Sequence, residues 1–268
     1  MQRTPVVAGQ FYSDSPQRLK QEVSGYLAQA SAPALSGKMA MVPHAGYMFS
    51  GAVAGRTLTR CSPADTVLLL GPNHTGRGKP FAVWSDGEWA IPGGSLTVEQ
   101  DLAARLLDSS SELEHDYEAH RFEHSLEVVL PFLWVRNAST RIVPVSVAEP
   151  GLAALMRAGR DIAGVVKDWS RPVTVVVSSD MSHFVSASQA QKKDEMAIQA
   201  IKELDGEKLY QVVRDNSISM CGVLPMTVGL SLAVELGATS AELVQYATSG
   251  DVIGDYQQVV GYAGMVLT

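Results

Sequence analysis

The stretch Thr66-Val67-Leu68-Leu69-Leu70-Gly71-Pro72-Asn73-His74 decides the fold, because it joins a short apolar run to a Gly-Pro break and a histidine. Apolar and polar residues do not alternate in this run, as they would in a strand with one solvent-exposed face. We therefore expect a strand that is covered on both faces of a sheet. Other short runs rich in Val, Ile and Leu predict further strands at 38–43, 140–147, 172–178, 241–247 and 258–267.

Helical patterns alternate with these strands, and they fall at 15–30, 97–108, 151–167, 187–204 and 223–236. Asp14-Ser15-Pro16 predicts the start of the first helix, and Gly237 predicts the end of the last. Thr97 and Gln100 have the spacing of a capping box. The first and third of these signals mark helix N-termini, and the second marks a C-terminus.

The order of strands and helices predicts an α/β fold, with a mixed β-sheet flanked by helices on both faces. A smaller pair of strands is expected at 81–84 and 88–91, joined by a turn at 85–87. No low-complexity tract or Pro/Ser-rich linker interrupts the chain, so we expect a single domain over residues 1–268.

Composition excludes several classes of partner. The chain has 268 residues, a formal net charge of -7 and no Lys/Arg cluster, which argues against nucleic acid or an anionic membrane. No apolar run approaches the roughly 20 residues of a membrane helix, and the first residues lack a signal-peptide pattern. We therefore expect a cytoplasmic protein, in which Cys61 and Cys221 stay thiols.

Two histidines directly follow predicted strands, His44 in Pro43-His44-Ala45-Gly46-Tyr47 and His74 in Gly71-Pro72-Asn73-His74. Ligands of open α/β sheets bind outside the carboxyl ends of the strands, so this position suits metal ligands. A histidine hydrogen-bonded within a turn is the alternative for each. Gly71 and Gly76 have the P-loop spacing, but Arg77 and Gly78 replace its Lys and Ser/Thr, which excludes a nucleotide site of that type.

A third segment, Ser178-Ser179-Asp180-Met181-Ser182-His183, follows the strand at 172–178. If the segment turns, Asp180 can hydrogen-bond to His183 and make it a general base. A serine hydrolase would use one of the neighbouring serines, but the chain lacks the G-x-S-x-G elbow of that class.

The segment Glu123-His124-Ser125-Leu126-Glu127 carries another candidate, His124. His120 lies four residues earlier, yet Arg121 stands where H-E-x-x-H needs glutamate, so the pattern is not a zincin. For His115 and His120 we expect surface positions.

Met220-Cys221-Gly222 precedes the helix at 223–236. A helix N-terminus favours thiolate, so we expect the pKa of Cys221 to be lowered and the sulfur to bind metal or attack substrate. For Cys61 we prefer the alternative, a buried apolar residue. Two histidines and a thiolate form an open metal site, which suits copper(I) or zinc and does not exclude iron(II).

Taken together, these segments resemble the Memo family, whose bacterial and archaeal members are labelled AmmeMemoRadiSam system protein B. The two small departures are Val129, where glutamine is expected, and Phe184, where tyrosine is usual. The resemblance runs nearly end to end and rests on these motifs: 5–12 (PVVAGQFY), 43–47 (PHAGY), 71–74 (GPNH), 123–127 (EHSLE), 178–183 (SSDMSH), 220–222 (MCG) and 248–251 (TSGD).

The family is similar in fold to the class III extradiol (LigB-like) non-haem iron dioxygenases. By that likeness His44 and His74 match iron ligands, and Cys221 stands where the dioxygenases carry a glutamate ligand. His183 matches their acid/base histidine, and His124 matches a second pocket histidine. Family members are associated with iron or copper and with redox roles, and a eukaryotic member with a phosphotyrosine receptor peptide. By name, prokaryotic members are linked to radical-SAM and AMMECR1-like proteins.

Three functions therefore stay open. The first is a metal-dependent redox protein or enzyme that holds iron(II), with copper or zinc as alternatives, at His44, His74 and Cys221. Asp180 and His183 would then move protons. The second is a non-catalytic binding or accessory module for a peptide or for a radical-SAM or AMMECR1-like partner. The third is a zinc-dependent hydrolase that uses the same ligands.

Overall fold

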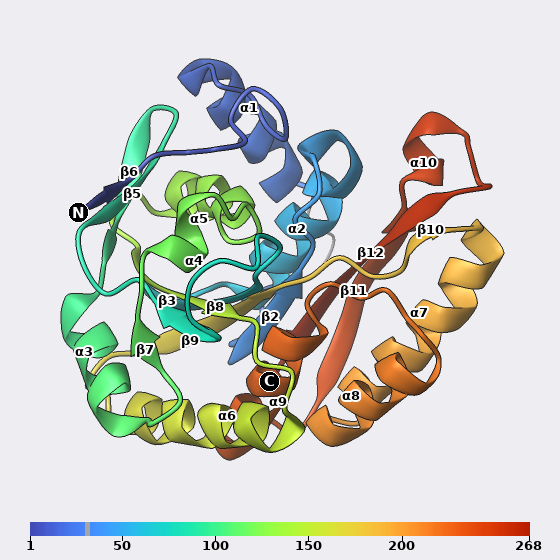
Figure 1. Ribbon diagram of the computed structural model, residues 1–268. Coiled ribbons are helices and arrows are strands. Elements are labelled where there is room, and N and C mark those ends of the chain that lie inside the picture. Colours follow the sequence, from blue (N-terminus) through green and yellow to red (C-terminus); the bar gives the residue numbers. More distant parts are fainter. Residues whose placement is uncertain (30–32) are drawn as a thin grey trace.

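The computed structural model describes residues 1–29 and 33–268 (Figure 1). A mixed sheet runs through the molecule, and its main path in the described residues has the order β1-β5-β6-β8-β3-β9-β2-β12-β10. Strand β11 pairs with β12, and β4 pairs with β7 and β8. The strands are β1 (Gln2–Arg3), β2 (Met39–Val42), β3 (Thr66–Pro72), β4 (Phe81–Val83), β5 (Glu88–Ile91), β6 (Gly94–Val98), β7 (Glu114–His115), β8 (Arg141–Val147), β9 (Val173–Ser178), β10 (His183–Val185), β11 (Ala241–Thr248) and β12 (Val259–Leu267).

Helices cover the sheet on both faces, as Figure 1 shows. The helices, with one 3-10 turn η1 (Glu127–Val129), are α1 (Pro16–Leu27), α2 (Tyr47–Cys61), α3 (Gln100–Ser109), α4 (Glu118–Arg121), α5 (Leu130–Arg136), α6 (Leu152–Lys167), α7 (Ala187–Lys202), α8 (Gly206–Asp215), α9 (Val223–Glu235) and α10 (Gly250–Ile253). Within the described residues, none is both long enough and apolar enough to cross a membrane.

Strand β3 shows why its sequence lacks alternation. Leu68 and Leu70 belong to the core under α3, α6, α8 and α9, whereas Val67 and Leu69 belong to the core under α1, α2 and α5. All four side chains are fully buried. Because successive residues point to opposite faces, a strand between two helical layers must be apolar throughout.

The predicted strands and helices agree well with these elements. The strands at 38–43, 66–71, 140–147, 172–178, 241–247 and 258–267 are confirmed as β2, β3, β8, β9, β11 and β12. The five predicted helices are confirmed as α1, α3, α6, α7 and α9, although residue 30 of the first lies outside the described residues. Gly237 follows α9 with a φ of 78°, as a helix-ending glycine does.

Two local predictions are wrong. The strands at 81–84 and 88–91 do not form a hairpin, because β4 pairs with β7 and β8 while β5 pairs antiparallel with β6. Thr97 lies in β6 and α3 begins at Gln100, so the expected capping box is replaced by Glu99 as the N-cap residue, without a side-chain cap.

Helix α2 has no counterpart among the predicted helices, and its glycines explain why. A Cβ at Gly51 would lie 2.5 Å from the Tyr26 ring, and a Cβ at Gly55 would lie 2.7 Å from the Tyr26 Cβ. Both glycines therefore let α2 pack closely against α1. They also lower the helix propensity of the segment, which hides the helix from pattern analysis.

The paired strands β11 and β12 lead to α10, which lies at the upper right of Figure 1. At the other end, β12 returns to pair antiparallel with β2. Strands β2, β9 and β3 are parallel neighbours, so their carboxyl ends meet at one edge of the sheet.

Candidate metal centre

The site lies at the edge where parallel strands β2, β3 and β9 end. His44 follows β2 and precedes α2, His74 follows β3, and Asp180 follows β9. Cys221 comes from the loop before α9, and a Cβ at Gly222 would lie 2.4 Å from the Cβ of Ser179. Glycine therefore lets the Cys221 loop approach the end of β9.

Three of the predicted residues come together as possible ligands. His44, His74 and Cys221 each offer an atom, and these atoms all lie within 4.8 Å of one another. The Cys221 sulfur is 3.4 Å from His44 Nε2. His44 is buried, Cys221 is partly buried, and the His74 side chain is 35% exposed. The group is therefore buried on one side and reachable from solvent on the other.

The hydrogen bonds of His44 fix its tautomer. Ser178 Oγ donates its hydrogen to the Ser125 carbonyl oxygen at 2.7 Å, so it must accept from His44 Nδ1, which lies 2.7 Å away. The proton of the neutral ring is then on Nδ1, and Nε2 keeps its lone pair facing Cys221. Burial, with His124 and His74 nearby, holds the pKa of His44 well below its usual value and keeps the ring neutral.

His74 is oriented in the same way by Glu123. Its Nδ1 lies 2.8 Å from Glu123 Oε1, and its backbone N–H also donates to the Glu123 carboxylate. Burial alone would lower the pKa of His74, but the hydrogen bond and charge of Glu123 outweigh it and raise the pKa. A carboxylate behind a histidine, which leaves the other ring nitrogen for a metal, is a recurring arrangement in metal sites.

Glu123 is a member of the site that the sequence does not predict, although it directly precedes the candidate His124. Its carboxylate is 2% exposed and also accepts the backbone N–H groups of His124 and Ser125, each at 2.9 Å. Burial opposes ionisation, yet these hydrogen bonds and the neighbouring His74 lower the pKa of Glu123 to about 2. The carboxylate is thus an anion fixed behind two histidines.

His124 also lies at the site, beside His74 and Glu123. Its ring stacks on that of His74 with centroids 4.8 Å apart. His74, Glu123 and His124 form a second group of possible ligand atoms within 4.8 Å. Burial lowers the pKa of His124 despite the nearby Glu123, which favours the neutral imidazole.

Asp180 and His183 lie at the site but do not pair as the sequence suggested. The Asp180 carboxylate accepts the backbone N–H of His44 at 2.8 Å, while His183 Nδ1 donates to the Ser219 carbonyl at 2.9 Å. Since a carbonyl only accepts, the proton of neutral His183 is on Nδ1 and Nε2 is free. Burial raises the pKa of Asp180 to about 6, although the hydrogen bond from His44 opposes this.

The predicted lowering of the Cys221 pKa is wrong for the metal-free chain. Burial, together with the charge of Asp180, raises the pKa of the thiol, although hydrogen bonds from the Asp180 backbone and the Ser179 side chain oppose this. The Asp180 backbone N–H nevertheless points at the sulfur, 3.2 Å away, and stabilises negative charge there. A thiol of this kind loses its proton when a metal ion binds.

Of the two remaining histidines, one is exposed and one is buried. His115 is exposed, as predicted. His120 is fully buried, because its Nε2 donates to the Ala82 carbonyl at 2.9 Å and its ring packs against Trp84 and Trp89, so the predicted surface position is wrong. Cys61 is a buried thiol whose pKa is raised to about 12 by desolvation.

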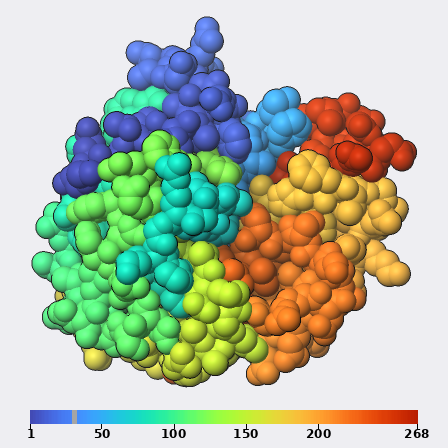
Figure 2. Space-filling model, in the orientation of Figure 1, coloured from blue at the N-terminus to red at the C-terminus, as the bar shows by residue number. Residues whose placement is uncertain are grey.

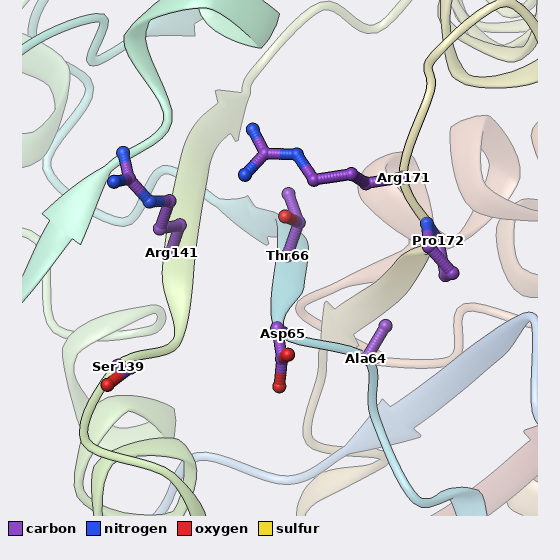
Figure 3. Close-up of a pocket in the computed structure, with 7 residues that line it drawn as sticks. All are labelled: Ala64, Asp65, Thr66, Ser139, Arg141, Arg171 and Pro172. Carbon is purple, nitrogen blue, oxygen red and sulfur yellow. The ribbon is translucent and has the colours of Figure 1, made fainter.

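A cavity of about 600 Å³ lies at the opposite edge, where β3, β8 and β9 begin (Figure 3). Figure 3 shows Arg141 and Arg171 on either side of Thr66. Arg171 donates to the buried Glu99 at 2.6 Å, and Arg141 Nε lies 3.7 Å from the same oxygen. Of the described residues that line this cavity, none is a predicted site residue.

The donor set fits a transition-metal ion. His44 Nε2 lies 3.4 Å from the Cys221 sulfur, His74 offers a ligand atom within 4.8 Å of both, and imidazole and thiolate suit zinc, copper and iron. The three side chains leave coordination positions for water or a substrate.

Comparison with known proteins agrees with the geometry. The family model described as "Memo-like protein" matches residues 3–266. The chain belongs to the Memo family. A MEMO1 family protein of Methanopyrus kandleri is 39% identical over 279 residues, covering 99% of both chains. Another, from Aquifex aeolicus, is 40% identical over 265 residues and covers 98% of both.

A solved structure of an uncharacterized protein from Escherichia coli K12 is similar to this Memo-family chain, with a TM-score of 0.57 and 14% sequence identity. The match covers 84% of this chain and 98% of that one. At this identity the likeness concerns the fold alone. It agrees with the predicted class, an α/β fold with helices on both faces of a mixed sheet.

Proposed function

We propose that this Memo-family protein binds a transition-metal ion through His44, His74 and Cys221 and acts as a metal-dependent redox protein. The observation that carries the proposal is the matched pair of tautomers. Ser178 and Glu123 hold the Nδ1 protons of His44 and His74, so both Nε2 atoms are free to bind at one point beside the sulfur. Histidines that served only as turn residues would not need this double orientation.

Iron(II) is the proposed metal, with copper or zinc as alternatives. Bound there, it would supply a Lewis acid and, if iron or copper, one-electron chemistry. Two carboxylates beside the ligands would support the bound ion. Glu123 balances the positive charge near His74, and Asp180 fixes the backbone of His44.

His183 is the proposed proton carrier of the site. The Ser219 carbonyl holds its Nδ1 proton, so Nε2 can accept a proton from a substrate group at the open side. Asp180 and His124 are proposed to assist, since both border the same ligand group. His74 is the most exposed of the three ligands, which places the path for a substrate on its side.

The test is the metal content of protein purified without oxygen, measured for iron, copper and zinc together. We compare the unaltered chain with Cys221→Ser and with Cys61→Ala, a matched change of a thiol outside the site. We expect close to one metal ion per chain in the unaltered protein and in Cys61→Ala. Cys221→Ser should lose at least about 10-fold in affinity, because oxygen is a poorer ligand for soft metals.

Equal and negligible metal in the unaltered protein and in Cys221→Ser would rule out the metal site. If zinc alone is retained and the protein hydrolyses esters or amides, the zinc-hydrolase function replaces the redox one. Oxygen consumption with a panel of small phenols, by iron-loaded protein, tests the redox role directly.

A second candidate, a non-catalytic binding module for a peptide or for a radical-SAM or AMMECR1-like partner, has one observation in its favour. Phe184 follows His183, is 74% exposed, and has a φ of 58°, which is costly for a bulky residue. An exposed aromatic ring held in a strained backbone beside the site suits contact with another molecule. Co-elution with such partners that is lost in Phe184→Ser, without turnover by the loaded protein, would favour this function.

A further inference from the structure

The N-terminal segment 3–12, which we call the N-terminal strap, lies on the segment 120–127 that carries Glu123 and His124. Figure 2 shows the blue N-terminal atoms lying on green atoms from the middle of the chain. The strap contributes no metal ligand. Its contacts nonetheless converge on the residues that orient the ligands.

Arg3 makes the central contacts of the strap. It is 2% exposed, and its guanidinium stacks over Trp89 with 4.3 Å between Cζ and the ring centroid. Nε donates to the His120 carbonyl at 2.9 Å, and Nη2 donates to the carbonyl of Glu123. One buried planar group therefore ties down the loop at both ends of the turn that precedes His124.

Glu127 accepts most of the other hydrogen bonds that the strap donates. This carboxylate is fully buried and lies 2.7 Å from Arg3 Nη1. It also accepts the backbone N–H groups of Val6 and Val7, each at 2.9 Å, and the hydroxyl of Tyr12 at 2.7 Å. Four donors from one short segment meet a single carboxylate, so the strap and the 120–127 segment are fixed to each other.

The far end of the strap reaches the other side of the site. The Phe11 ring meets the His124 ring edge-on, with centroids 5.1 Å apart. The Phe11 carbonyl accepts the Tyr47 backbone N–H at 2.7 Å, at the start of α2 and three residues after His44. The strap thus connects the loop of His44 with the loop of Glu123 and His124.

We infer that Arg3 is a positioning residue of the metal centre, an inference that rests on the proposed function. Its hydrogen bond fixes the Glu123 backbone, and the Glu123 side chain in turn sets the orientation of His74. Burying a guanidinium costs several kcal/mol, and an apolar side chain could anchor a chain end without that cost. The planar group with donors in several directions is needed to hold two carbonyls and a carboxylate at once.

The test uses Arg3→Lys, which keeps the charge beside Glu127 but cannot hold both carbonyls and the carboxylate. Gln2→Ala is the matched control, because Gln2 precedes Arg3 in β1 but its side chain is exposed and bonds to Glu88. Metal-free protein is titrated with cobalt(II), and the dissociation constant and visible absorption spectrum are recorded. We expect Arg3→Lys to weaken cobalt binding by about 10-fold or more and to shift the absorption bands. Gln2→Ala should change neither.

Amide hydrogen exchange of the metal-free proteins separates this inference from the metal proposal. Faster exchange at residues 120–127 in Arg3→Lys, together with weaker cobalt binding, supports the positioning role. Faster exchange with an unchanged dissociation constant and spectrum overturns it, because Arg3 would then be only structural. Absence of cobalt binding by the unaltered chain refutes the proposed function, and this inference with it, whatever the exchange data show.

If Arg3→Lys does not fold, Phe11→Leu replaces it, since this change leaves Arg3 and Glu127 intact and removes only the ring contact with His124. A shifted cobalt spectrum in Phe11→Leu, with unfolding like that of the unaltered chain, supports the role of the strap. An unaltered spectrum and dissociation constant overturn it.

Discussion

Replacing Glu123 with glutamine should destabilise the metal-free protein strongly and in a pH-dependent way. The carboxylate is 2% exposed and accepts four donors: the ring Nδ1–H and backbone N–H of His74 and the backbone N–H groups of His124 and Ser125. Glutamine would turn an NH₂ group toward at least one of these donors. The change therefore removes a buried anion and leaves donors unpaired.

The magnitude follows from the lowered pKa of Glu123. A shift from 4.5 to about 2 corresponds to a stabilisation of about 3 kcal/mol in the ionised form. Because the folded pKa is lower than the unfolded one, this stabilisation is complete above pH 4.5 and is lost as the pH falls toward 2. At pH 3.5 it should have decreased to about 2 kcal/mol.

Urea unfolding of the chelator-treated protein at pH 7 and pH 3.5 measures this difference. The control is Glu118→Gln, which changes an exposed carboxylate in α4, five residues before Glu123, paired with Arg121 at 3.3 Å. We expect the control to alter the free energy of unfolding by about 0.5 kcal/mol or less. A loss below about 1 kcal/mol for Glu123→Gln at pH 7, or an equal loss at both pH values, would refute the reasoning.

Two further predictions concern the backbone. Gly55→Ala should destabilise the protein by about 1–3 kcal/mol, since the added Cβ would lie 2.7 Å from the Tyr26 Cβ. Gly25→Ala, with open space around it, should stabilise the protein by up to about 1 kcal/mol. Thermal unfolding compares the two variants, and equal midpoints would contradict the close packing of α1 and α2. Phe184→Gly should raise the free energy of unfolding by about 1 kcal/mol, because glycine tolerates a φ of 58°. A lower free energy of unfolding in urea would show instead that the exposed ring makes stabilising contacts in the folded chain.

The sequence predicted the parts of the site that follow strands. His44 and His74 come after apolar runs, and parallel strands end at one edge, so their meeting could be expected. The sequence could not show that Glu123 lies behind His74, because the contact joins residues 49 apart and neither residue lies in a helix or strand. The burial of His120 depends likewise on Ala82 and the tryptophans, which are distant in sequence.

Predictions based on one element at a time failed where a tertiary contact prevailed. A helix N-terminus alone would lower the pKa of Cys221, but burial against Asp180 raises it. Asp180 and His183 are close enough in sequence to pair, yet the His44 backbone and the Ser219 carbonyl are better placed partners. The three residues 85–87 suit a turn between β4 and β5, but β5 pairs instead with β6, which is longer than β4.

The separation of Cys221 from His44, 177 residues along the chain, has a consequence for folding. A bound ion would join the two like a cross-link that closes a very long loop, and such links restrict the unfolded chain most when the loop is long. During synthesis the histidines emerge well before the sulfur, so a nascent chain cannot assemble the complete set of ligands. Loading with metal should therefore come last, after the sheet has closed, and should slow unfolding of the whole molecule instead of one loop.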